Sequence, residues 1–130
     1  MANEKLNIDA VSLKPFVPAL DFELSKKFYQ DIGFQLEWSD SNLAHLQTGT
    51  CGFLLQNYFI EDFANNMVLH LTVNHCEDLH KILKATISKY SFPVYLEEIT
   101  MKEWGVRDFV FKDPSGVMWR VAEIKKESTI

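Results

Sequence analysis

The chain has 130 residues, of which 47% are hydrophobic and 24% are charged, and its formal net charge is -5. This length predicts one domain, over residues 1–130, that buries roughly two thirds of the surface exposed by the unfolded chain. The acidic balance argues against nucleic acid as a partner, because phosphates need clustered Lys and Arg side chains. No segment approaches the ~20 apolar residues of a membrane helix, and the first residues lack a signal-peptide pattern, so we expect a cytoplasmic protein with no membrane partner.

A first structural module is predicted over about residues 10–57. It begins with a strand over Ala10–Ala19, which contains two prolines and therefore belongs at a sheet edge, because proline cannot donate a ladder hydrogen bond. A helix follows, with Asp21 as a favourable N-cap and Gly33 as a left-handed C-terminal residue. The buried face of this helix repeats every fourth residue, at Leu24, Phe28 and Ile32, and three strands come next, over Phe34–Trp38, Leu43–Leu46 and Phe53–Gln56.

A second module is predicted over about residues 67–124, after a connector at residues 58–66 in which periodicity lapses. It begins with a strand over Met67–Val73. Asn74, with Glu77 three residues later, resembles a capping box at the start of a helix. The apolar stripe of that helix consists of Leu79, Ile82, Leu83, Thr86, Ile87 and Tyr90.

The chain ends with a predicted β-hairpin over residues 104–124. Pro93 closes the preceding helix, and a short strand over Val94–Leu96 and an acidic loop over Glu97–Glu103 lead into the hairpin. The turn is Asp-Pro-Ser-Gly at residues 113–116, which has favoured residues at the first, second and fourth positions of a type I turn. Alternation places Val117, Trp119, Val121 and Glu123 on one face of the last strand, and Met118, Arg120, Ala122 and Ile124 on the other.

The order of secondary-structure elements therefore repeats, although the amino-acid sequences of the two modules are not similar. We predict an α+β fold of two βαβββ modules, each a sheet of about four strands covered by one helix. The uncovered faces of the sheets would then meet in a concave pocket, which is a common place for a small-molecule ligand.

The repeat and the final hairpin together resemble a known family. The hairpin has the pattern Trp104-Gly-x-Arg107-x-Phe109-x-x-x-Asp113-Pro-x-Gly116, and residues 21–34 look like the family's first helix and its exit. The chain is similar, over roughly residues 11–124, to the vicinal-oxygen-chelate superfamily of glyoxalases, bleomycin resistance proteins and dioxygenases. The resemblance implies a glyoxalase/bleomycin-resistance-type fold with a concave mixed sheet.

Catalytic members of this superfamily hold a divalent metal with His and Glu side chains on the pocket faces of the strands. The resemblance places the three ligand positions of the simplest members on about Lys14, His70 and Arg120. Two of these are cations that would repel a divalent ion, so the metal set is not kept and no cofactor is expected. Glu123 lies three residues past the usual ligand and on the opposite strand face.

The most similar members are the bleomycin resistance proteins, which lack the metal and sequester a large, flat, cationic drug in aromatic-lined grooves, commonly two per homodimer. The resemblance thus implies antibiotic resistance by ligand binding, a small-molecule partner and a homodimer. Trp104 matches the Trp of the family's Trp-Gly motif, and Trp38 falls where an aromatic is usual. We predict that the ligand is bound by Trp38, His70, Trp104 and Arg120, with Trp104 as stacking platform and Arg120 as hydrogen-bonding charge.

These residues do not predict that the ligand is cationic, as it is in the bleomycin resistance proteins. An acidic loop with Glu97, Glu98 and Glu103 could attract a cation, whereas Lys14 and Arg120 would oppose one. An aromatic or anionic ligand therefore stays open.

Two further functions stay open as alternatives. One is a metal-dependent lyase, isomerase or dioxygenase with a rearranged site that uses His70 and Glu123. The other is an interaction module whose pocket is filled by its own side chains, with Phe53, Phe109, Met118 and Trp119 as candidates. Whether the modules pair within one chain or between two chains is also open.

Overall fold

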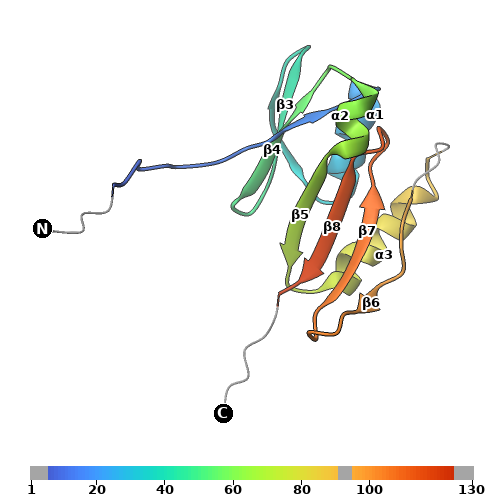
Figure 1. The fold of residues 1–130 in the computed structure, drawn as a ribbon. Coiled ribbons are helices and arrows are strands. Elements are labelled where there is room, and N and C mark those ends of the chain that lie inside the picture. The colour runs from blue at the N-terminus through green and yellow to red at the C-terminus, as the bar shows by residue number, and fades with distance from the viewer. Residues whose placement is uncertain (1–5, 91–94, 125–130) are drawn as a thin grey trace, which may run out of the picture.

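The structure, a computed structural model, describes residues 6–90 and 95–124 of the chain and confirms the predicted α+β fold of two repeated modules. Figure 1 shows two separate sheets with their helices. The first module comprises β1 (Phe16–Pro18), α1 (Phe22–Asp31), β2 (Gln35–Ser39), β3 (Leu43–Thr48) and β4 (Cys51–Gln56). A connecting helix, α2 (Glu61–Asn66), leads to β5 (Val68–Val73), α3 (Cys76–Ile87), β6 (Thr100–Met101), β7 (Arg107–Lys112) and β8 (Met118–Glu123).

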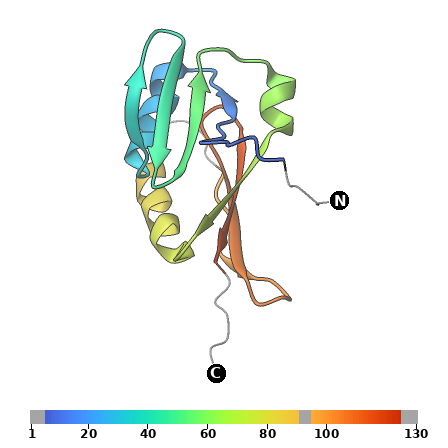
Figure 2. The ribbon, with the colours of Figure 1, turned by 90° about the vertical axis from the view of Figure 1, so that its left-hand side faces the viewer.

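The two sheets have the same topology. Their strand orders are β1-β4-β3-β2 and β5-β8-β7-β6, so the first strand of each module pairs with the last. That pairing is parallel in both sheets, while the other neighbours are antiparallel, which makes both sheets mixed. Figure 2 shows α1 and α3 one above the other on one side of the molecule, with α2 on the other side.

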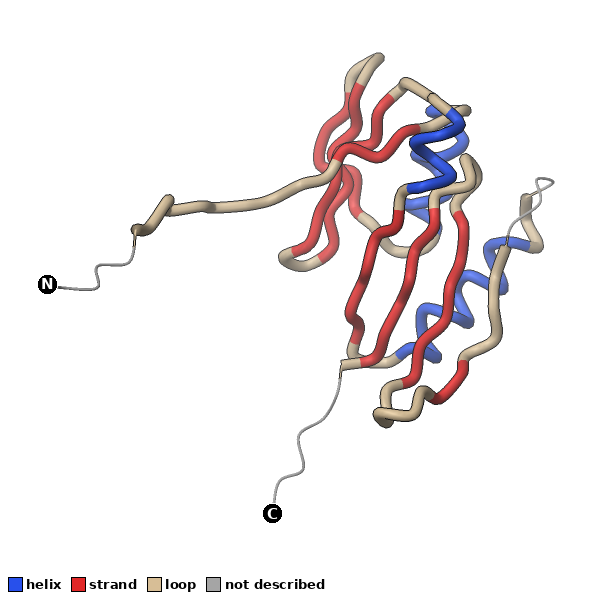
Figure 3. Tube along the Cα trace, viewed as in Figure 1, coloured by secondary structure: helices blue, strands red, loops and turns tan. Residues whose placement is uncertain are grey.

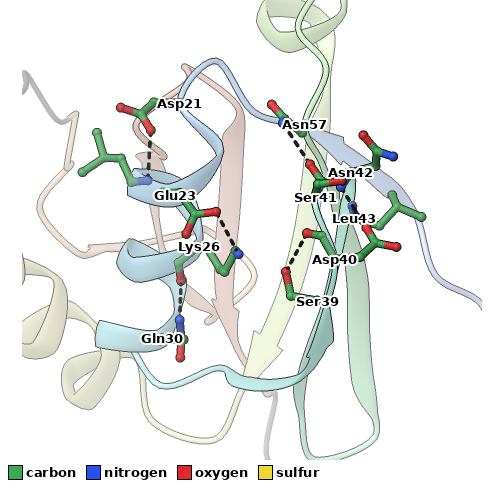
Figure 4. A network of polar contacts seen from close by, with 11 residues as sticks. Asp21, Glu23, Lys26, Gln30, Ser39, Asp40, Ser41, Asn42, Leu43 and Asn57 are labelled. Atoms are coloured by element: carbon green, nitrogen blue, oxygen red, sulfur yellow. Dashed lines mark hydrogen bonds and ion pairs between the residues drawn. The ribbon is translucent and has the colours of Figure 1, made fainter.

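Helix α1 has the ends that the sequence predicts. Its N-cap Asp21 accepts a hydrogen bond through Oδ1 from the Leu24 amide at 3.1 Å, and Glu23 pairs with Lys26 at 3.1 Å (Figure 4). The helix is followed by Gly33 at φ +121°, a left-handed conformation that glycine adopts at little cost. Its buried face packs Phe28 and Tyr29 into the core.

The turn between β2 and β3 is held by one carboxylate. Asp40 Oδ1 accepts from the amides of Asn42 and Leu43, both at 2.8 Å, and the Asn57 side chain donates to the Ser41 carbonyl at 3.0 Å (Figure 4). These hydrogen bonds from backbone amides lower the pKa of Asp40, because they stabilise its charged form. The strand register shifts between Leu36 and Trp38, which turns Trp38 to the face opposite the core.

An aromatic core joins the two modules. Trp119 of β8 stacks on Phe111 of β7, with centroids 5.8 Å apart and planes 8° apart, and also contacts three aromatic rings of the first module. The Trp119 indole donates to Tyr29 Oη at 2.9 Å, and that hydroxyl donates to Asp113 in the β7–β8 turn. Burial raises the pKa of Asp113 to about 6. Trp119 is thus a core residue.

Several predicted elements differ from the observed ones. The first strand is only Phe16–Pro18, and residues 6–15 extend away from the sheets as a loop (Figure 3). Pro18 lies within this strand, although proline cannot donate a ladder hydrogen bond. The connector contains helix α2, and the acidic loop contains the short strand β6. Leu96 forms only an isolated bridge with Phe111, while Pro93 and Val94 lie outside the described residues.

The start and end of α3 were also predicted wrongly. The capping box does not form, because His75 occupies the N-cap position and its side chain makes no capping hydrogen bond. Tyr90 lies three residues beyond the end of the helix at Ile87. Within the described residues, no helix has the length and apolarity needed to cross a membrane.

Candidate functional site

The open face of the second sheet carries two rows of side chains. His70 of β5 lies beside Arg120 of β8, which in turn pairs with Val110 of β7. The next row runs from Thr72 through Ala122 to Asp108 and Thr100. The parallel β5–β8 register thus brings together residues that lie 50 positions apart in the chain, as in His70 and Arg120.

A cavity of about 630 Å³ lies over this face. Three of the four predicted ligand residues line it together, namely His70, Trp104 and Arg120. Lys102, Asp108 and Glu123 also contribute to its lining. Of the side chains that could have filled the pocket, Phe53, Phe109 and Trp119 are buried in the core, and Met118 does not line the cavity.

Trp104 is presented by a tight turn between β6 and β7. The Lys102 amide donates to the Val106 carbonyl at 2.8 Å, and the Gly105 amide donates to the Lys102 carbonyl at 2.9 Å. Gly105 has φ +83°, which favours glycine there. The turn leaves Trp104 61% exposed, so its indole is available for stacking and does not belong to the core.

The fourth predicted residue, Trp38, lies on the other sheet. It is 47% exposed and ends a row across the open face of the first sheet, after Phe16, Leu54 and His45. The register places these four side chains on the same face. The cavity of the second sheet therefore does not include Trp38 within one chain.

A buried carboxylate organises the charges of the cavity. Asp108 Oδ1 lies 3.3 Å from Lys102 Nζ, and Asp108 Oδ2 lies 3.6 Å from Arg120 Nη1. The Thr100 hydroxyl donates to Asp108 Oδ1 at 3.4 Å. Neither Lys102 nor Asp108 was predicted from the sequence as a site residue. Strand alternation was the available signal for Asp108, because it lies one residue before buried Phe109 and so faces the side of Arg120.

Glu123 is held on the opposite side of the sheet from His70. Its carboxylate accepts from Arg107 Nε at 3.2 Å and Nη2 at 2.8 Å, and from the Cys76 amide at 3.1 Å at the start of α3. These bonds, the one from Arg107 above all, lower the pKa of Glu123 because they stabilise the charged form. His70 and Glu123 both contribute to the lining of the cavity, but the Glu123 carboxylate is engaged by Arg107 and the Cys76 amide and does not pair with His70 as a metal ligand.

The residues at the metal positions of the superfamily do not fit a metal ion. Lys14 lies before β1 and donates to the Ser12 hydroxyl, and Arg120 is a fixed cation beside Asp108. His70 alone could ligate. Among the described residues, no group of three or more His, Cys, Asp and Glu side chains has a geometry that could hold a metal.

The glutamates of the acidic loop do not line the cavity, although Lys102 of the same loop does. Glu97 accepts from the Val110 amide at 3.1 Å and from the Tyr95 hydroxyl at 2.9 Å, so it holds the loop against β7. Neither Glu98 nor Glu103 lines the cavity. The loop thus offers no carboxylate to a cation bound there.

A second cavity, of about 600 Å³, lies between the modules, on the side of β5 that faces the helices. Its walls are largely apolar and include Ile32, Phe34, Leu71, Val73, Leu79 and Ile82. None of the predicted site residues lines it.

Solved structures of other proteins share this architecture. A bleomycin-binding protein from Streptomyces verticillus, solved with copper(II)-bleomycin, matches with a TM-score of 0.75 and 16% identity, over 92% of this chain and 100% of the other. A bleomycin resistance determinant encoded on the transposon Tn5 matches with a TM-score of 0.74 and 18% identity, over 90% and 100% of the two chains.

An enzyme has a similar fold. Lactoylglutathione lyase from Agrobacterium tumefaciens matches with a TM-score of 0.62 and 15% identity, over 88% of this chain and 94% of the other. No protein-family model matches the chain, and a search of curated proteins gave no match. The fold is therefore that of the vicinal-oxygen-chelate superfamily, which bleomycin-binding proteins and lactoylglutathione lyase share.

Proposed function

We propose that this protein binds a flat aromatic small molecule in the cavity of its second sheet, without a metal, and that it protects the cell by sequestering that molecule. The observation that carries the proposal is the exposed indole of Trp104 beside His70 and Arg120 in one cavity of about 630 Å³. A cavity of this size suits a drug-sized ligand. The likeness to bleomycin-binding proteins supports the same class of function.

The side chains at the metal-ligand positions support ligand binding and not metal-dependent catalysis. Of the three metal positions that the superfamily uses, this chain has one histidine and two cations, and Glu123 is held by Arg107. A Lewis-acid mechanism needs several ligands that converge on one point, and these side chains do not converge. The chemistry of a lyase, isomerase or dioxygenase therefore has no support from these residues.

A homodimer is part of this proposal. Four apolar side chains of the N-terminal arm, Leu6, Ile8, Val11 and Leu13, are 89% to 98% exposed. The row that ends in Trp38 is also uncovered, and α2 adds exposed Phe63. A second copy that covers these surfaces would remove apolar area from water and could set Trp38 over the partner's cavity. We place this dimer in the cytoplasm, where Cys51 and Cys76 stay reduced.

The experiment that tests the proposed function is a thermal-shift titration in the presence of EDTA with bleomycin and a panel of other flat aromatic compounds. A ligand that binds only the folded protein raises the melting temperature by mass action. We expect at least one aromatic compound to do so, and we expect the shift to vanish in Trp104→Ala. Tyr95→Ala is the matched control, because Tyr95 is an exposed aromatic outside the cavity. A shift with Zn²⁺, Mn²⁺, Ni²⁺ or Fe²⁺ and none with the aromatic panel would contradict the proposal.

A further inference from the structure

The charges that face the cavity of the second sheet do not suit a cationic ligand. Lys102 and Arg120 share the single carboxylate of Asp108, which leaves one positive charge in excess among these three side chains. The carboxylate of Glu123 is paired with Arg107 on the opposite face. The cavity is therefore a positive area on a chain whose formal net charge is -5.

The two arginines of this sheet differ in how many donors are already engaged. Arg107 donates to Glu123 through Nε and Nη2 and to Glu77 through Nη1 at 2.6 Å, so every nitrogen of its guanidinium has a partner. Within residues 6–90 and 95–124, Arg120 has one ion pair, at 3.6 Å from Nη1, and its side chain is 44% exposed. A guanidinium with free N–H groups is the usual partner for a planar oxyanion, which it binds with two parallel hydrogen bonds.

The arrangement pairs this cation with an aromatic surface. Trp104 follows Lys102 by two residues and lines the same cavity as Arg120. One ligand could therefore stack an aromatic ring on Trp104 while its acidic group reaches Arg120 and Lys102.

We propose that the ligand of this cavity is an aromatic anion, with a carboxylate-type group bound by Arg120 and Lys102 and a ring stacked on Trp104. The inference rests on the proposed function and narrows its ligand class. It departs from a cationic guest, because Asp108, the one carboxylate between the two cations, is already shared by both.

The test uses three probes of one shape that differ in charge: 2-naphthoate, neutral 2-naphthamide and cationic 2-naphthylmethylammonium. Binding is measured by isothermal titration at low and high salt. A charge-assisted pair of hydrogen bonds predicts that naphthoate binds about tenfold or more tightly than naphthamide. This advantage should shrink as salt is added, because salt screens the ionic interaction.

Variants of the cavity residues show which side chains cause the preference for naphthoate over naphthamide. Arg120→Gln should remove most of the advantage of naphthoate over naphthamide, Lys102→Gln should remove part of it, and Arg120→Lys should keep some because the charge remains. Lys84→Gln is the matched control, since Lys84 lies in the last turn of α3 and lines none of the cavities described above. It should leave the three affinities unchanged. The melting temperature of each variant shows whether it folds.

Each other result overturns the inference in a distinct way. Equal affinities for the three probes, lost in Trp104→Ala, would leave the proposed function in place and remove the anion preference. Tighter binding of the ammonium probe would do the same and point to a cationic ligand. No binding by any probe would remove the cavity as an aromatic site, so the proposed function and the inference would fail together.

Discussion

The three tryptophans of this chain have three different environments. Trp119 is 4% exposed in the core, while Trp38 and Trp104 are 47% and 61% exposed on different sheets. Alternation places Trp119 on the same strand face as Val117 and Val121, and these two valines are buried as well. Nothing in the sequence alone decides whether Trp104 is buried, because it depends on the turn that Gly105 closes.

The first prediction contrasts two of these tryptophans. Trp119→Ala should lower the free energy of unfolding by about 3 to 5 kcal/mol, because it leaves a cavity and removes the hydrogen bond to Tyr29. Trp104→Ala should change it by less than about 0.5 kcal/mol, as expected for an exposed side chain outside the core. Urea unfolding of both variants measures this. Comparable losses in the two would show that Trp104 is a packing residue.

The second prediction concerns Asp113, whose pKa is raised to about 6 by burial. The folded protein binds this proton more tightly than the unfolded chain, so the stabilising contribution is complete below about pH 4 and is lost as the pH rises through about 6. A shift of about two units corresponds to roughly 3 kcal/mol at most. In Asp113→Asn this pH-dependent contribution to the free energy of unfolding disappears.

The measurement is urea unfolding of the wild-type protein and Asp113→Asn between pH 4 and pH 8. The difference in unfolding free energy between the two should change by up to about 3 kcal/mol in favour of the variant as the pH rises. The difference is used because other carboxylates, such as Glu123 with its lowered pKa, lose stability in the opposite direction, as the pH falls. A constant difference would mean that Asp113 does not titrate differently on folding.

At the scale of elements, the sequence predicted best where a local rule decides the structure. The β7–β8 hairpin and α1 follow from their turn residues and caps, and both were predicted correctly. Strand β6 and helix α2 were missed, since the one has two residues and the other six, too few for periodicity to appear. The register of β5 beside β8 was also beyond sequence patterns, because it pairs strands about 50 residues apart.

The third prediction compares two helix starts. Asp21→Ala should destabilise the protein by about 1 kcal/mol, because the Leu24 amide loses its side-chain acceptor. Asn74→Ala should have an effect below about 0.5 kcal/mol, since the capping box of α3 does not form. Chemical unfolding at neutral pH measures both. A larger loss in Asn74→Ala than in Asp21→Ala would reverse the assignment of the caps.

At the scale of the whole molecule, the two modules pack against each other through the sheet faces that carry the aromatic core. The opposite face of each sheet remains open. Aromatic contacts of Trp119 with the first module hold the halves together. The sequence predicted the two modules and three residues of the cavity, but it could not show that Trp38 belongs to the other open face. That depends on how the modules are placed, and not on the pattern of either one.

The fourth prediction tests the proposed dimer. The protein should sediment at twice the chain mass of 15.1 kDa. The double variant Val11→Asp, Leu13→Asp should shift it toward the monomer, because each buried apolar side chain contributes about 1.5 to 3 kcal/mol and a buried charge opposes association. Ser12→Asp, which adds a charge to the same arm, is the control. A wild-type protein that sediments as a monomer at tens of micromolar would contradict the dimer.

The most direct test of ligand binding at Trp104 without a metal is an NMR titration that follows the indole N–H signals of Trp38, Trp104 and Trp119. The aromatic panel, which includes bleomycin and 2-naphthoate, is added in the presence of EDTA. We predict that the Trp104 signal shifts and saturates with an aromatic ligand, while buried Trp119 stays nearly constant. If Trp104 does not respond to any of these compounds, or responds only when a divalent metal is supplied, then the cavity of the second sheet is not a metal-free aromatic site.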